Sequence, residues 1–437
     1  MKFRKPQFGL LLSLLAVGSM WLYVHRVVIP YQKEDPLGKQ QPRGNLSDLY
    51  PRWLGARELL LHHRDPYSSE ITREIQIGFY GRPLDPSRPE DPKDQEGFAY
   101  PVYVVFVLAP TITMQFSTLQ AVCRWLLPMM VGGSVLLWLR FLRWRLSLWG
   151  YATALVLTLG NFAVVQGLKL QQLSVVVSAL IAAQVVLLAG GQLVLAGILL
   201  SIATLKPQLV VPLSCWLLLW SVSRWKERRK FFWAFLLSQS LLLAASELVL
   251  PGWIGEFRQA VVAYRHYTDA VSPIELLTTH TLGIPLSAFV AGATALVCWR
   301  WRLREANTLD FALVTSLVLA VTVAIVPIVN TYNQVLLLPA ILVLAQSARR
   351  VWMQSQVSKV VSSIVLVFLV WPWIVAFVLL LASYVIPLSI VERAWAVPFW
   401  TIPATPLAIV SLSFVSSWLP NSSARSAALQ PCPQNTQ

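Results

Sequence analysis

Apolar runs recur along the whole chain, and those of about 17 or more residues are each long enough to cross a hydrocarbon core of about 30 Å. The sequence is 56% hydrophobic but only 13% charged, whereas soluble proteins carry roughly 25% charged residues. This pattern predicts an all-α polytopic integral membrane protein. The thirteen candidate segments are 8–29, 101–117, 119–139, 148–166, 172–189, 191–205, 208–222, 231–250, 281–299, 311–329, 334–347, 360–384 and 397–418.

The net charge of +15 is unevenly distributed over the 437 residues. Region 29–100 holds twelve acidic and ten basic residues, so the rest of the chain carries +17. Basic clusters that flank apolar spans are typical of cytoplasmic loops, and this distribution argues against nucleic acid as a partner. The clusters are Arg140, Arg143 and Arg145; residues 224–230; Arg300, Arg302 and Arg304; and Arg349 with Arg350.

The same clusters constrain the topology. If basic residues 2–5 are cytoplasmic and all thirteen segments cross, two clusters fall outside; if either 101–117 or 119–139 does not cross, every cluster falls inside. We therefore expect about twelve crossings, with both termini cytoplasmic, in a plasma or inner membrane. Segment 8–29 lacks a small-residue cleavage site and is longer than a signal-peptide core, so we expect a retained signal anchor.

Two regions, 30–100 and 251–280, are predicted to be external. The second combines aromatic and charged side chains, among them His266, which suits an interfacial or substrate-facing helix. The chain is predicted to form one transmembrane domain, 1–420, followed by a polar tail at 421–437 that is predicted to be disordered.

The middle of the first external region is predicted to be a helix. Apolar residues recur at helical spacing between Leu49 and Leu61, Ser47 suits the N-cap and Pro51 suits the first turn. Charged residues take the other positions, so this helix is expected to lie in the membrane interface. The Pro- and Asp-rich stretch 81–97 is predicted to be a loop.

Asp48, at the start of this helix, has two interpretations. As a structural residue, it is stabilised by the helix dipole by about 0.3–1 kcal/mol. As a functional residue, it is a general base held at the outer membrane face. At the other end of the helix, Asp65-Pro66-Tyr67 is by default a turn.

Three polar positions lie where apolar runs end. Lys206 is either a lysine that snorkels to the interface or a contact for a phosphate, because a cation outside the cytoplasmic clusters opposes the positive-inside bias. Gln172 lies at the preceding external turn and suits a polar patch between helices. Glu247 lies near the outer end of an apolar run, where an ionisable group is costly and suggests function.

A polar island, Asn330-Thr331-Tyr332-Asn333-Gln334, interrupts the apolar pattern at another external end. Five consecutive polar residues exceed what a turn requires, so a substrate-facing role is expected.

The sequence carries no Walker A motif, no Gly-rich Rossmann turn and no Asp-x-Asp pair in the external loop. The four cysteines lack metal-ligand or disulfide spacing, and no metal or other cofactor is expected. Chemistry at an external face without a nucleotide site points to a lipid-carried, already activated substrate.

The motif Asp48-Leu-Tyr-Pro-Arg-Trp53, followed by Ala56-Arg57 and Asp65-Pro66-Tyr67, resembles the first-loop motif of glycosyltransferase family 87. These GT-C fold enzymes include polyprenyl-phosphate-mannose-dependent mannosyltransferases. Later elements of the family are resembled by Phe98-Ala-Tyr100-Pro101, by Gln172-x-Ser174, by Lys206-Pro207 and by the polar island.

Two positions depart from the family pattern. The glycine that usually precedes the Gln-x-Asn/Ser element is Gln171 here, and the late turn, which often carries a histidine, offers Asn330, Tyr332 and Asn333.

The resemblance implies a GT-C-like bundle of about 12 transmembrane helices with interfacial helices in the first external loop. It implies transfer of a mannose-like hexose from a polyprenyl-phosphate donor to a glycolipid or glycan acceptor, with Asp48 as general base. Cations such as Lys206, Arg52 and Arg57 would stabilise the phosphate leaving group. The other implied substrate-binding residues are Trp53, Tyr100, Gln172, His266, Asn330, Tyr332 and Asn333.

The rival interpretation is a polytopic transporter, or a lipid-linked glycan flippase or polymerase, without this transferase chemistry. Charges at the membrane midplane and internal repeats would mark a transporter. The charges here gather at span ends, and the sequence shows no repeat.

Overall fold

The computed structural model describes residues 5–33, 44–85, 87–89, 91–268 and 270–417. Its regular structure in these ranges is entirely helical, which confirms the all-α prediction. The tail 421–437 lies outside the described residues. The α-helices are α1 Lys5–Tyr23, α2 Ile29–Lys33, α3 Leu49–His62, α4 Ser69–Tyr80, α5 Val104–Leu108, α6 Phe116–Phe141, α7 Leu148–Leu159, α8 Phe162–Lys169, α9 Leu173–Ala189, α10 Leu193–Ala203, α11 Pro207–Ser223, α12 Trp225–Val249, α13 Trp253–Tyr267, α14 Pro273–Leu277, α15 His280–Trp301, α16 Leu309–Ile325, α17 Leu338–Gln354, α18 Gln356–Val385, α19 Leu388–Glu392 and α20 Ala404–Ser417. Shorter helical turns are η1 Val24–Val28, η2 Ala109–Thr111, η3 Thr331–Leu337 and η4 Val397–Phe399.

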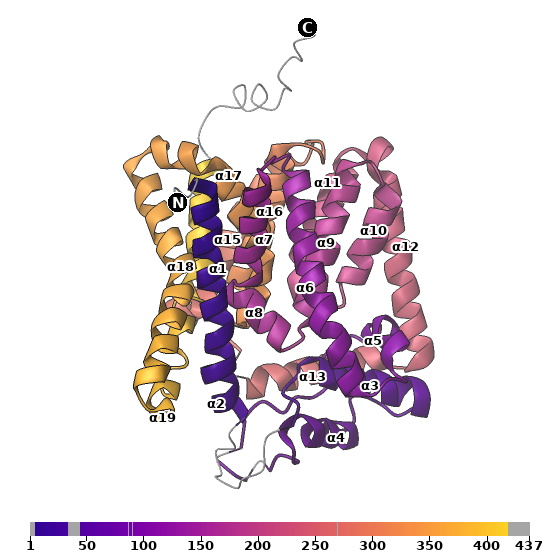
Figure 1. The fold of residues 1–437 in the computed structure, drawn as a ribbon. Coiled ribbons are helices and arrows are strands. Elements are labelled where there is room, and N and C mark those ends of the chain that lie inside the picture. The colour runs from indigo at the N-terminus through magenta and orange to yellow at the C-terminus, as the bar shows by residue number, and fades with distance from the viewer. Residues whose placement is uncertain (1–4, 34–43, 86, 90, 269, 418–437) are drawn as a thin grey trace.

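Most of the long helices run side by side, and α3, α4 and α13 lie across one end of the bundle (Figure 1). In the described part of the chain, seven helical segments are long and apolar enough to cross a membrane, or eight if α7 and α8, bent by 58°, form one span. Four shorter apolar helices, α9, α10, α11 and α16, accompany them. The chain is therefore a multi-pass membrane protein, and the count of about twelve crossings stays a prediction.

The two adjacent apolar segments 101–117 and 119–139 differ in structure. The first forms only the short helix α5 and the turn η2, whereas the second lies within the 26-residue helix α6. A segment broken in this way is too short to span a membrane as a helix. This agrees with the expectation that one of the two does not cross.

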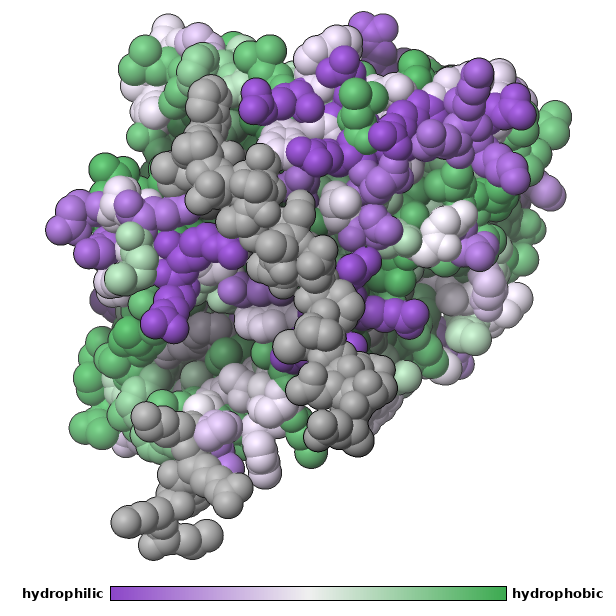
Figure 2. Space-filling view, turned by 90° about the horizontal axis from the view of Figure 1, so that it is seen from above, coloured by the Kyte–Doolittle hydropathy of each residue, from purple (hydrophilic) through white to green (hydrophobic). Residues whose placement is uncertain are grey.

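Three of the basic clusters gather at the end of the bundle opposite α3 and α4. Helices α6, α11 and α15 finish there and α12 begins there, which brings together Arg140, residues 224–230 and residues 300–304 (Figure 1). Viewed onto this end, the surface has a hydrophilic band bordered by hydrophobic residues (Figure 2). The charge asymmetry predicted from the sequence is therefore present in three dimensions.

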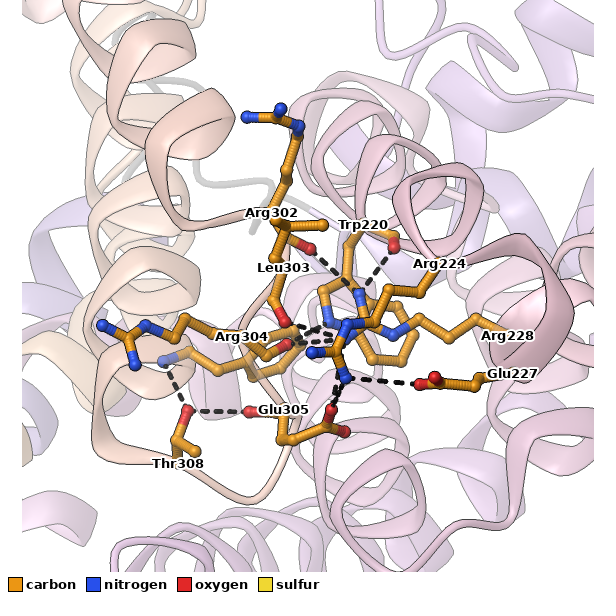
Figure 3. A network of polar contacts seen from close by, with 10 residues as sticks. Trp220, Arg224, Glu227, Arg228, Arg302, Leu303, Arg304, Glu305 and Thr308 are labelled. Carbon is orange, nitrogen blue, oxygen red and sulfur yellow. Dashed lines mark hydrogen bonds and ion pairs between the residues drawn. The ribbon is translucent and has the colours of Figure 1, made fainter. Parts of the chain in front are cut away.

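Arg228 on α12 ties three helix ends together at this face (Figure 3). Its guanidinium donates to the carbonyl oxygens of Trp220 at 2.8 Å, Arg302 at 2.9 Å and Arg304 at 2.9 Å. A fourth bond reaches the carbonyl of Leu303 at 3.3 Å, and the cation lies 4.0 Å from the Trp220 ring centroid. One buried cation thus satisfies a carbonyl in the last turn of α11 and the carbonyls of the three residues that follow α15. We refer to this arrangement as the arginine clamp.

The helix predicted in the first external region is α3, and more than half of its residues are buried. Asp48 occupies the N-cap position, while the Oγ atom of Ser47 accepts from the amide of Leu49 at 3.3 Å. The helix thus begins one residue later than predicted, although it is the Ser47 hydroxyl, and not the Asp48 side chain, that accepts from an amide of the first turn. The predicted turn at Asp65 is present, because its carboxylate accepts from the amide of Tyr67 at 2.9 Å.

The loop after α4 covers α3, and a glycine allows the close approach. A Cβ atom at Gly55 would lie 2.4 Å from the Phe98 ring, so only glycine fits beneath this ring. The Tyr67 hydroxyl donates to the carbonyl of Tyr100 at 2.5 Å. These contacts fix residues 94–100 beside the start of α3.

Candidate active site

Four segments that are far apart in the sequence meet at the start of α3. The side-chain amide of Gln172, before α9, donates to the carboxylate of Asp48. Its carbonyl oxygen accepts from the ammonium of Lys206, before α11, at 3.1 Å. The Gln172 amide therefore bridges an anion and a cation, each through the atom of matching polarity.

Lys206 is only 4% exposed and is held by polar side chains. Its Nζ atom donates to Ser174 Oγ at 2.7 Å and to Asn333 Oδ1 at 3.2 Å, and it lies 4.8 Å from the Tyr332 ring centroid. Burial lowers the pKa of Lys206, which lies in the turn between α10 and α11, to about 7. The snorkelling interpretation is wrong, because a snorkelling lysine keeps its ammonium group in water.

The backbone of Asp48 is anchored to the turn that carries Gln172. The Asp48 amide donates to the carbonyl of Leu170 at 3.0 Å, and the Ser47 hydroxyl donates to the side-chain oxygen of Gln171 at 2.6 Å. Gln171 has a φ of 55°, in the left-handed region that glycine adopts more readily. The turn thus requires the conformation of the glycine usual in the resembled family, and here the Gln171 side chain adds a contact to Ser47.

Arg52, one turn into α3, is a second buried cation. It donates to the carbonyl of Asp48 at 2.6 Å, lies 4.5 Å from the Tyr100 ring centroid and approaches the carboxylate of Glu96 to 3.8 Å. Its Nε atom is buried without a hydrogen-bond partner. Such an orphan donor is unfavourable in a closed site and is suited to an incoming acceptor.

Two carboxylates that the sequence analysis missed, Asp94 and Glu96, lie close to this centre. Burial raises the pKa of Glu96 well above its ordinary value, and the charges of Asp94 and Asp48 raise it further. Glu96 also has a φ of 52°, a strained backbone state for a side chain of this size. The sequence signal was an Asp-x-Glu pair just before Phe98.

Asp48 has the environment of a proton acceptor. Burial raises the pKa of its carboxyl, and the charge of Arg52 and the hydrogen bond from Gln172 oppose that rise. A carboxylate with a raised pKa accepts a proton more readily near neutral pH.

A cavity of about 510 Å³ opens beside this centre. Cations and apolar side chains line it together, a combination suited to an amphipathic anion. We call it the donor-side cavity. Its lining includes the cations Arg52, Lys206, Arg258 and Arg265, the polar residues Tyr100, Tyr264, Asn330 and Tyr332, and the apolar residues Ile254, Phe257, Val261 and Val262 of α13.

Five predicted substrate-binding residues do not line this cavity: Gln172 and Asn333, which contact Lys206 from behind the lining, and Trp53, Arg57 and His266. Arg57 stacks on Trp53 at 5.5 Å, and Trp53 is buried with its indole donating to the carbonyl of Thr111 at 3.1 Å. His266 is exposed on α13. Glu247, the alternative carboxylate, accepts from the amide of Gly252 at 2.7 Å and therefore stabilises the turn after α12.

The arrangement combines a half-buried carboxylate, two buried cations and a partly apolar cavity. The cations can stabilise negative charge that develops on a leaving group, and the carboxylate can take a proton from a nucleophile.

A comparison with protein families decides the class of the chain. The model for glycosyltransferase family 87 matches residues 98–327, which is more than half of the sequence. The chain belongs to glycosyltransferase family 87. This family 87 protein is accordingly a membrane glycosyltransferase, and the predicted family is confirmed.

No curated protein sequence and no solved structure matches the chain. The family match includes Tyr100, Gln172 and Lys206 but begins after Asp48 and ends before Asn330. The roles of these last two residues therefore rest on their positions in the structure.

Proposed function

We propose that this family 87 member transfers a mannose-like hexose from a polyprenyl-phosphate donor to a glycolipid or glycan acceptor. The observation that carries the proposal is the donor-side cavity, where Lys206 and Arg52 meet an apolar wall. Arg52 is hydrogen-bonded to the Asp48 carbonyl, and Lys206 is linked to the Asp48 carboxylate through Gln172. The family assignment favours a transferase over a transporter, flippase or polymerase.

The donor fits the cavity by its two chemistries. The phosphate would lie against Lys206 and Arg52, where it can replace one of the longer Lys206 contacts and accept from the orphan Nε atom of Arg52. The first isoprene units would lie along Ile254, Phe257 and Val262 of α13. A nucleotide donor would not use this apolar wall.

The proposed reaction is a single displacement. The acceptor hydroxyl oxygen attacks the anomeric carbon, the bond from that carbon to the phosphate oxygen breaks, and polyprenyl phosphate leaves with the electron pair. Asp48 takes the hydroxyl proton, and Lys206 and Arg52 stabilise the phosphate. A phosphate leaving group needs no proton, so the mechanism uses one carboxylate as base, unlike the pair in glycosidases.

The site is proposed to face the outside or periplasm within a GT-C-like bundle. The support is the separation of Asp48 from the basic clusters, which lie at the opposite end of the bundle (Figure 1). Cysteines introduced near Gly81 and Gly255 should react with an impermeant reagent in intact cells, and cysteines near Lys226 and Arg302 should not. Labelling with the reverse pattern would contradict this orientation.

The proposed reaction is tested with the purified full-length protein in detergent. We expect cleavage of polyprenyl-phosphate [¹⁴C]mannose and transfer of label to glycolipid extracted from the source membrane, with GDP-mannose inactive as donor. Other polyprenyl-phosphate hexoses tested in parallel identify the sugar. Use of the nucleotide sugar, or transport of the lipid without cleavage in proteoliposomes, would overturn the proposal.

A further inference from the structure

A second and larger cavity, of about 860 Å³, lies on another side of α13. It is built mainly by α4 and the loop that follows it, together with Ala260, Ala263 and Tyr267 of α13. The donor-side cavity is lined by other positions of the same helix, including Phe257 and Val261. Helix α13 therefore separates two chambers.

The two chambers are adjacent, because they share a lining residue. Ala99 lines both of them. A third cavity, of about 410 Å³ and lined by Asp94, shares Tyr267 with the large cavity and shares Tyr264 and Asn330 with the donor-side cavity. The third cavity, with Asp94 in its lining, thus borders both the large cavity and the donor-side cavity that Lys206 lines.

The lining of the large cavity suits a carbohydrate. The rings of Tyr67 and Tyr267 offer amphipathic surfaces, and the side chains of Ser69, Thr72 and Gln95 offer donors and acceptors. The apolar residues of this lining are fewer and mostly smaller than those of the donor-side cavity, which favours a carbohydrate over a lipid tail; they are Pro83, Leu84, Phe98, Ala99, Ala260 and Ala263. A volume of this size is typical of a small-molecule site.

The charge of the lining is positive. Arg73 is exposed and makes no hydrogen bond or ion pair with any residue that the structure describes. Arg88 pairs with Asp85 at 3.4 Å, and Arg82 pairs with Asp91 at 2.5 Å. Arg82 and Arg88 are therefore each paired with a carboxylate, which leaves Arg73 as the lining cation that offers its charge to a ligand. Arginine binds carboxylate and phosphate groups through two parallel hydrogen bonds.

We propose that the large cavity binds the acceptor, and that the acceptor is an oligosaccharide carrying a carboxylate or phosphate group held by Arg73. The inference rests on the proposed function, because it assigns the second substrate of the same reaction. The lipid donor then approaches from the apolar side of α13, and the acceptor approaches from the α4 side.

The test is binding of soluble probes to the purified full-length protein, measured by calorimetry. The probes are tetragalacturonate for a carboxylate, a mannose tetrasaccharide bearing a 6-phosphate for a phosphate, and maltotetraose as the neutral reference. We expect at least one anionic probe to bind about 10-fold more tightly than maltotetraose, as a charge-assisted hydrogen bond predicts. The tighter anionic probe identifies the group.

The variant Arg73→Gln should remove this preference, and Arg73→Lys should keep part of it. Arg229→Gln, which loses the same charge from an exposed position at the opposite end of the bundle, is the matched control and should bind like wild type. Melting temperatures close to wild type would show that the variants fold. Equal binding of all three probes, no binding of any of them, or equal losses in Arg73→Gln and Arg229→Gln would overturn the proposal.

Binding of polyprenyl phosphate in detergent separates this inference from the proposed function. Arg73→Gln should bind polyprenyl phosphate like wild type. If wild type binds no polyprenyl phosphate but still prefers an anionic oligosaccharide through Arg73, the donor assignment fails and the carbohydrate site stands. If polyprenyl phosphate binds and the Arg73 preference is absent, only the acceptor inference fails.

Discussion

Lys206 and Arg228 are both buried cations that connect distant segments, at opposite ends of the bundle, but their partners differ in kind. Arg228 donates to four main-chain carbonyls at helix ends. Lys206 donates to three side chains, those of Gln172, Ser174 and Asn333, and lines an open cavity. Unpaired main-chain carbonyls occur at helix ends in any fold, whatever the sequence. Three polar side chains that converge on one cation occur only where the sequence places those residues.

These different partners indicate that Arg228 stabilises the fold, whereas Lys206 is available to a ligand. The guanidinium of Arg228 already donates to four carbonyl oxygens, so it does not need an added anion as a partner. Around Lys206, by contrast, Asn333 Nδ2 and Arg52 Nε are buried without partners. These orphan donors would gain partners from a bound phosphate, which makes the two regions respond differently to substitution.

The largest expected effect is on activity, from Asp48→Asn. The rate of transfer should fall by at least about 100-fold, because the amide cannot accept the acceptor proton. Stability should change by no more than about 1 kcal/mol, the contribution of a charge near a helix N-terminus. Transfer rate and melting temperature are measured on the same preparation, with Glu247→Gln as control. Near-normal transfer by folded Asp48→Asn protein would exclude Asp48 as the base.

A substitution in the arginine clamp should affect stability strongly and donor kinetics little, the opposite of Asp48→Asn. Arg228→Ala leaves several buried carbonyls without donors and should lower the free energy of unfolding by about 3 kcal/mol or more, seen as a lower melting temperature in detergent. The donor KM of the protein that remains folded should stay near wild type. A raised KM with unchanged melting temperature would contradict the structural role assigned to Arg228.

Lys206→Ala should raise the donor KM by about 10-fold or more, the loss expected for a charge-assisted hydrogen bond to phosphate. The pKa of Lys206 near 7 gives the sign of the pH dependence: the ammonium is lost as pH rises through 7, so the wild-type donor KM should increase above pH 7. Lys206→Arg keeps its charge and should flatten this profile. Identical donor kinetics for Lys206→Ala and wild type across pH 6–9 would remove Lys206 from the phosphate site.

The smallest expected effect is from Glu96→Gln. Burial and the charges of Asp94 and Asp48 raise the pKa of Glu96 and so favour its protonated form, which a neutral amide resembles; Glu96→Gln should therefore change transfer at pH 7 by only a few-fold. An acid with a raised folded-state pKa contributes stability at low pH that is lost as pH rises toward that pKa. The melting temperature of wild type should therefore fall more steeply above pH 5 than that of Glu96→Gln. A loss of transfer as large as that of Asp48→Asn would make Glu96 a rival base.

The sequence predicted the helical class and the separate polar positions, because apolar runs and their interruptions are local signals. Gln172, Lys206 and Asn333 stood out as polar residues at span ends. Their convergence on Asp48 depends on helix packing, which no local pattern encodes. The hydrogen bond from the Asp48 amide to Leu170 is an example of a contact invisible to periodicity.

The errors have physical causes as well. Glu96 was overlooked because acidic residues are ordinary in a Pro- and Asp-rich loop, and only burial makes this one unusual. Ser47 was predicted as the N-cap from its residue type; α3 starts one residue later, and the Ser47 hydroxyl also donates to Gln171. Arg57 was predicted to stabilise the phosphate because of its charge alone. In the structure its guanidinium lies over the ring of Trp53.

The attachment of Asp48 to the turn at Leu170 has a consequence for thermal motion. The base and the Gln172 amide are joined through hydrogen bonds within one short junction, so they are displaced together and their separation varies little. Helix α13 has a single well-buried residue, Trp253, and sparsely buried elements open at lower free energy. Fluctuations of α13 would therefore alter how long the lipid stays bound while leaving the proton-transfer geometry largely intact.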